Sequence, residues 1–172
     1  IKVLEEEVGK VHISADIGCH SFATFEPFSL GNSILGFGMS LASAAAVAPF
    51  QKKRSISIMG DGGFWHNGLT SGVISSLLNQ GDSILIIMQN GYTSATGQQF
   101  IPSSAKARGD HVPGMTIGET LSALGVSWLR TVYTYGVSNM VDTLRDALTT
   151  PHQGLKVIIA DGECQLAKQR RV

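Results

Sequence analysis

The chain reads SISIMGDG at residues 55–62, an apolar strand that runs directly into an acidic residue between two glycines. Residues 83–88 form a second apolar run, and Gln89-Asn90-Gly91 follows it. Strands that are apolar on both faces are typical of parallel sheets buried between helices. We therefore predict that Asp61 and Asn90 lie at the ends of two neighbouring strands of one sheet.

Strands and helices alternate around these two segments. Apolar runs predict strands at residues 11–15, 55–59, 83–88, 126–132 and 155–160. Helices are predicted at residues 31–48, 65–79, 116–124 and 137–148, and a long polar loop at residues 89–113. This order predicts an α/β fold, a doubly wound and mainly parallel sheet with helices on both faces.

The bulk properties favour one ordered domain over residues 1–172. The chain is 43% apolar, and its formal net charge of +0 offers no field for nucleic acid or an acidic membrane. Its two cysteines, Cys19 and Cys164, form no Cys-x-x-Cys pair, so we expect a reducing, cytoplasmic location and no zinc or iron–sulfur ligands here. Residues 34–50 are too short and too interrupted to predict a membrane span. The absence of an initiator Met suggests a fragment of a longer protein.

The two polar strand ends suit a metal ion that carries a diphosphate. Gly60 and Gly62 let the backbone approach a ligand, and a helix that begins there offers free N–H groups to a phosphate. Asp61 and the side-chain oxygen of Asn90 would then bind Mg²⁺, which prefers hard oxygen ligands and takes few of them from protein. The alternative for each residue alone is a helix cap and a turn.

These residues also resemble a family signature. Gly60-Asp61-Gly62, followed after residues 63–88 by Gln89-Asn90, is similar to the thiamine diphosphate motif, in which Asn-Asn follows Gly-Asp-Gly after such a spacer. Gln89 replaces the first Asn, whereas the second, usually the metal ligand, is present. The wider series resembles the 2-oxoacid:ferredoxin oxidoreductases, most closely the indolepyruvate type, in the segments 16–19, 36–40, 60–68, 93–99 and 163–166.

The resemblance implies a set of site residues. Asp61 and Asn90 would hold Mg²⁺ together with the backbone carbonyl of Tyr92. Around the diphosphate, one side would be lined by Gly60, Gly62 and Gly63, and the other by Gly91, Thr93, Ser94 and Ala95. Cys19 would lie near the thiazolium ring, although it could instead be a small buried residue in a turn.

The resemblance further implies the reaction and the partners. The domain would bind thiamine diphosphate for the oxidative decarboxylation of a 2-oxoacid such as indolepyruvate to an acyl-coenzyme A, with electrons passed through iron–sulfur clusters to ferredoxin. The clusters would lie in other domains or subunits. The Glu that activates the cofactor would come from a pyrimidine-binding domain or subunit, so no catalytic residue is assigned here and a homodimer or hetero-oligomer is expected.

Two other functions stay open. One is a non-oxidative thiamine-dependent decarboxylase or an acetolactate-synthase-like enzyme, against which the segment 96–99 speaks. The other is a non-catalytic α/β interaction domain, against which the presence of both Asp61 and Asn90 speaks. His20 and His66 are candidates to border the substrate, each with a local structural role as the alternative.

Overall fold

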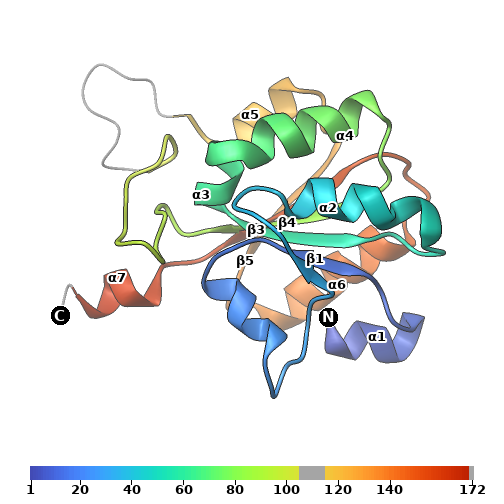
Figure 1. Cartoon of the computed structure of the whole chain (residues 1–172), viewed down its shortest axis with the longest axis horizontal. Helices are drawn as coiled ribbons and strands as arrows, with labels where there is room; N and C mark the ends of the chain where they lie inside the picture. The colour runs from blue at the N-terminus through green and yellow to red at the C-terminus, as the bar shows by residue number, and fades with distance from the viewer. Residues whose placement is uncertain (105–114, 171–172) are drawn as a thin grey trace.

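The computed structural model describes residues 1–104 and 115–170, and in these residues a single sheet of six parallel strands forms the centre of the molecule (Figure 1). The strand order is β2-β1-β3-β4-β6-β5, and every neighbouring pair is parallel. The predicted parallel α/β sheet is therefore confirmed. The strands are β1 Ile13–Ala15, β2 Ser33–Ile34, β3 Ile56–Gly60, β4 Ile84–Gln89, β5 Trp128–Tyr133 and β6 Lys156–Asp161.

Helices cover both faces of this sheet. In Figure 1, α2, α3, α4 and α5 lie above the sheet, whereas α1 and α6 lie below it. The α-helices are α1 Lys2–Val8, α2 Ser40–Val47, α3 Asp61–Gly63, α4 Ser75–Leu78, α5 Ile117–Ala123, α6 Val137–Thr149 and α7 Gln165–Gln169. Two 3-10 segments, η1 Cys19–Thr24 and η2 Ala48–Phe50, and a π-helical segment, η3 Phe64–Ile74, complete the described helical structure.

Two hydrophobic cores lie on opposite faces of the sheet because side chains alternate along each strand. Ile84 and Ile86 of β4 pack with Leu4 of α1 and Leu144 of α6. Leu85 and Ile87 enter the other core, which α2, η3 and α5 complete. Burial on both faces explains why the central strands are continuously apolar.

The chain order creates a crevice at one end of the sheet. From β1 the chain passes outward to the edge strand β2, and it then returns to β3 on the other side of β1. In open parallel sheets, ligands bind beyond the carboxyl ends of the strands at such a switch point. Asp16 follows β1 and Asp61 follows β3, so both acids lie there.

Two of the predicted helices are wrong in extent. The helix expected over residues 31–48 begins only at Ser40, and residues 33–34 pair with β1 as a short edge strand. Gly31 and Gly38 have φ values of 109° and 81°, which a right-handed helix cannot contain. The helix expected over residues 65–79 instead begins at Asp61, directly after β3.

Two further helices and the predicted 89–113 loop also need comparison with the structure. The sequence patterns did not predict α1 or α7. In the predicted 89–113 loop, Gln89 is the last residue of β4, and residues 90–104 have no strand or helix, only one antiparallel bridge between Thr93 and Gln99. Residues 105–113 of that prediction lie outside the described residues.

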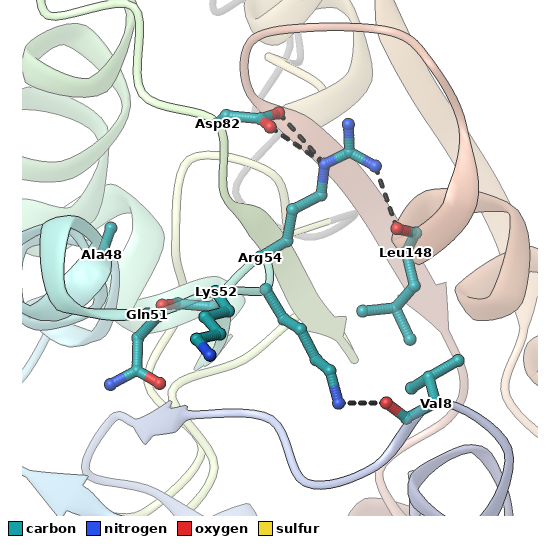
Figure 2. A pocket seen from close by; sticks show the side chains of 9 residues that line it. Val8, Ala48, Gln51, Lys52, Arg54, Asp82 and Leu148 are labelled. Carbon is teal, nitrogen blue, oxygen red and sulfur yellow. Dashed lines mark hydrogen bonds and ion pairs between the residues drawn. The ribbon is translucent and has the colours of Figure 1, made fainter.

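A basic turn secures the amino end of the sheet and borders a cavity of about 450 Å³ (Figure 2). The Arg54 guanidinium donates from Nε to Asp82 Oδ2 at 3.1 Å and from Nη1 to the Leu148 carbonyl, in the last turn of α6, at 3.0 Å. Lys156 has no exposed surface, and its ammonium contacts the same Asp82. These basic side chains neutralise one carboxylate and satisfy carbonyls at a helix end, so this cavity is bordered by structural contacts.

We predict that Asp82→Ala lowers the free energy of unfolding by about 2 kcal/mol. The change leaves a buried ammonium and a largely buried guanidinium without their shared carboxylate, and the effect stays below that of a fully buried pair because 35% of the Asp82 side chain is exposed. Urea denaturation measures it. Asp142→Ala, which removes an exposed partner of Arg145, is the matched control, and we expect a change below about 0.5 kcal/mol. Equal losses in the two variants would contradict the prediction.

Candidate functional site

A cavity of about 540 Å³ opens beyond the carboxyl ends of β1, β3 and β4. The structure brings the predicted cofactor residues together around it: every one of them except Gly91 lines the cavity. The N–H of Gly91 instead donates to Asp61. The predicted residues in the lining are Cys19, Gly60, Asp61, Gly62, Gly63, Asn90, Tyr92, Thr93, Ser94 and Ala95.

Asp61 joins the ends of two strands. It is the first residue of α3, directly after β3, and only 1% of its surface is exposed. Its Oδ1 accepts the Gly62 N–H at 2.9 Å, while Oδ2 accepts the N–H groups of Asn90 at 2.8 Å and Gly91 at 2.7 Å. One carboxylate thus fixes the start of the helix and the turn after β4.

Burial raises the pKa of Asp61, although hydrogen bonds from the Gly91, Asn90 and Gly62 amides oppose the rise. The described residues place no Lys, Arg or His in an ion pair with this carboxylate. A buried carboxylate without a charged partner is costly. A bound cation at this place would remove that cost.

Asn90 lines the same cavity as Asp61. Its Oδ1 accepts the backbone N–H of Tyr92 and the hydroxyl of Ser94, each at 3.1 Å. These bonds curl residues 90–94 into a turn and hold the amide in one orientation. The donors available for a metal are therefore hard oxygens, one carboxylate and one amide, which suit Mg²⁺ better than a soft metal. The described residues hold no cluster of three or more His, Cys, Asp or Glu placed for a metal.

The glycines after β3 are required by close packing. A Cβ at Gly62 would lie 2.2 Å from Thr93 Oγ1, and one at Gly63 would lie 2.2 Å from Asp16 Oδ2. Gly60 differs, since a Cβ there meets nothing within 4 Å. Asp16 is itself fixed, because both of its carboxylate oxygens lie 2.7 Å from the Gly38 nitrogen just before α2. Residues 60–63, at the amino end of the helical run that starts at Asp61, line the cavity, and a helix start of this kind stabilises an anion.

The remaining predicted residues occupy the rim. Cys19 lines the cavity with an exposed thiol, so it is not the buried turn residue of the alternative interpretation. His20 also lines it, and burial lowers the pKa of its imidazole despite opposing contacts with the backbone of Asp16 and Ile58. His66 is exposed and does not line the cavity, but its ring packs 5.2 Å from that of Phe37, which does.

Several residues of the site were not predicted from the sequence. Apolar side chains of Ile17, Phe37 and Met88 line the cavity. The hydroxyl of Ser104, 1% exposed, donates to the Gly91 carbonyl and accepts the Ile101 N–H at 2.8 Å. Ile17 lies inside the Asp16–Cys19 segment, and Met88 lies just before Gln89. The residues next to both in the sequence therefore already indicated this part of the site. Nothing near Ser104 in the sequence did.

Several known proteins are similar to this chain in sequence or in fold. Indolepyruvate oxidoreductase subunit IorA of Archaeoglobus fulgidus is 29% identical over 99% of this chain, and that of Methanothermobacter thermautotrophicus is 27% identical over 95%. This chain spans about a quarter of those proteins, 27% and 26%. A 2-oxoglutarate:ferredoxin oxidoreductase of Magnetococcus marinus shares the fold, with a TM-score of 0.76 and 16% identity over 94% of this chain and 58% of its own.

No helix in the described part of the chain is both long and apolar enough to cross a membrane.

The sequence profile of a family described as thiamine pyrophosphate enzyme, C-terminal TPP binding domain, matches residues 16–160. That range runs from the acid after β1 to the penultimate residue of β6 and contains both strand ends that meet at Asp61. The chain thus belongs to the C-terminal thiamine pyrophosphate-binding domains of thiamine pyrophosphate enzymes.

Proposed function

We propose that this domain holds thiamine diphosphate and Mg²⁺ at the carboxyl ends of β3 and β4, within an enzyme that oxidatively decarboxylates a 2-oxoacid. The observation that carries the proposal is the buried Asp61 carboxylate, bonded to the turn that presents the Asn90 amide. A thiamine pyrophosphate-binding domain of a 2-oxoacid:ferredoxin oxidoreductase-like enzyme is the class that the comparisons support.

The residues present fit the proposed cofactor. Asp61 Oδ1 accepts a single hydrogen bond and keeps a lone pair for a cation, and the Asn90 amide and the Tyr92 carbonyl would complete the protein ligands. Gly60, Gly62 and Gly63 would leave room for the diphosphate on one side. Gly91, Thr93, Ser94 and Ala95 would enclose it on the other, with Cys19 near the ring.

The bound cofactor would supply the electron sink that decarboxylation of a 2-oxoacid requires. The chain's own residues would orient the diphosphate and exclude water, because the walls around it include Ile17, Phe37 and Met88. The activating Glu would come from a pyrimidine-binding domain or subunit. A homodimer or hetero-oligomer would therefore form the complete site.

The names of the relatives favour indolepyruvate or a similar aryl 2-oxoacid as the substrate. Coenzyme A would then take the acyl group, and ferredoxin would take the electrons through iron–sulfur clusters in other domains or subunits, in the cytoplasm. A non-oxidative decarboxylase would instead release an aldehyde without coenzyme A or an electron acceptor. Product analysis of the full-length protein with indolepyruvate, with and without both co-substrates, distinguishes the two.

We predict that Asp61→Ala weakens binding of thiamine diphosphate with Mg²⁺ by about 100-fold or more, since it removes a metal ligand. Calorimetric titration of the full-length protein measures this, and circular dichroism verifies that the variant folds. Asp146→Ala, an exposed acid on α6, is the matched control and should bind normally. Chelation of Mg²⁺ should abolish binding to the wild type. Equal affinity of Asp61→Ala and wild type would refute the proposed site, and failure of the wild type to bind would favour a non-catalytic domain.

We predict that Gly62→Ala weakens cofactor binding about tenfold or more. For Gly60→Ala, we predict that the thermal unfolding midpoint of the protein stays unchanged. The methyl group added at Gly62 would clash with Thr93 and displace the opposite wall of the cavity, whereas the methyl group added at Gly60 would enter open space. Thermal unfolding and cofactor titration of both variants test this difference. A Gly62→Ala protein with wild-type affinity would show that the close approach of Thr93 has no part in binding.

A further inference from the structure

The segment that follows the last strand runs beside the turn that lines the cavity. We call residues 161–170 the supporting segment and residues 89–99 the cofactor loop. Figure 1 shows α7, the helix of the supporting segment, next to this loop, away from the covered faces of the sheet. The first contact is between strand ends: Gln89 Nε2 donates to Asp161 Oδ1 at 2.9 Å, and the Gly162 N–H donates to the Gln89 carbonyl at 3.0 Å.

Two further contacts follow in the same order along both segments. The Ser94 side chain lies at Cys164, where a hydrogen bond from it helps to lower the pKa of the thiol. Farther on, Arg170 Nη1 lies 3.4 Å from Gln98 Oε1. Contacts at the start, middle and end of both segments mean that the supporting segment follows the cofactor loop along its length.

The Asp61 carboxylate and bonds among the loop's own residues hold the start of the cofactor loop. Its own backbone closure is a bridge between Thr93 and Gln99, with N···O distances of 2.9 and 3.2 Å. Gln98 has a φ of 61°, a left-handed conformation that is unfavourable for a residue with a side chain. Contacts from the supporting segment therefore act together with these internal bonds on residues 92–96, which line the cavity.

Ser94 connects the supporting segment to the proposed metal site. Its hydroxyl has one proton and two neighbours that can accept it, Asn90 Oδ1 at 3.1 Å and the sulfur of Cys164. Asn90 Oδ1 already accepts a second bond from the Tyr92 N–H, so both of its lone pairs are in use. A hydroxyl that turns to Cys164 frees one of these lone pairs for a cation.

We infer that the supporting segment sets the position of the cofactor loop, with Asp161, Cys164 and Arg170 as positioning residues. The effect on the metal ligand rests on the proposed function, whereas the ordering of the loop does not. The contacts described above join the segment to Gln89, Ser94 and Gln98 of the loop, and of these Ser94 lines the cavity.

The first test is cofactor affinity, measured by calorimetric titration of the full-length protein with thiamine diphosphate and Mg²⁺. Asp161→Ala, Cys164→Ala and Arg170→Ala should each raise the dissociation constant about fivefold, the ratio that one net hydrogen bond contributes. Cys164→Ser, which keeps an acceptor for the Ser94 proton, should restore most of the affinity. Lys168→Ala is the matched control: this exposed residue lies on the same helix, and its substitution should leave affinity unchanged.

The second test is amide hydrogen exchange of the cofactor loop in the same proteins without cofactor. The N–H groups of Gly91, Thr93 and Gln99 should exchange faster in the three alanine variants than in wild type or Lys168→Ala, while the amides of β4 stay protected. Unchanged exchange would overturn the inference whether or not the cofactor binds. If wild type binds the cofactor, and the three variants match it within twofold, positioning fails and the proposed function stands. If wild type does not bind but exchange rises, the proposed function fails and the support of the loop stands.

Discussion

The geometry of the site depends on one buried carboxylate. Asp61 accepts three backbone N–H groups, one from its own helix and two from the turn after the next strand. No other described side chain ties the ends of β3 and β4 together in this way. The parallel register, with Gly60 opposite Met88, brings both ends to one level, and the carboxylate then fixes the turn that carries Asn90.

The surrounding packing follows from this constraint. Because the helix begins immediately after Gly60, the next residues pass close to other side chains. Gly62 approaches Thr93 and Gly63 approaches Asp16, so only glycine fits at these two positions. Asp16 extends the same arrangement to β1 and to the start of α2 through the Gly38 amide. Two buried acids thus fix the chain after the ends of β1, β3 and β4, and the cavity opens beyond these ends.

Much of this could be predicted from sequence because the decisive signals are local. Largely apolar runs marked β3, β4 and β6, and Asp61 and Asn90 directly follow β3 and β4. The segment before α2 was misjudged, because small residues suit helices and tight loops alike and only the positive φ of Gly31 and Gly38 decides between them. Ser104 and the supporting segment were not assigned a role, because they act through contacts between residues distant in sequence, which no local pattern encodes.

The two ends of the sheet have different roles. Arg54, Lys156 and Asp82 secure the amino ends of the strands, and Asp61 and Asn90 occupy the carboxyl ends, with the length of the strands between them. Substitutions at sites that share no partners have nearly additive effects. Evolution can therefore adjust the heat resistance of such a domain at one end while it retunes ligand preference at the other, and a protein engineer can do the same.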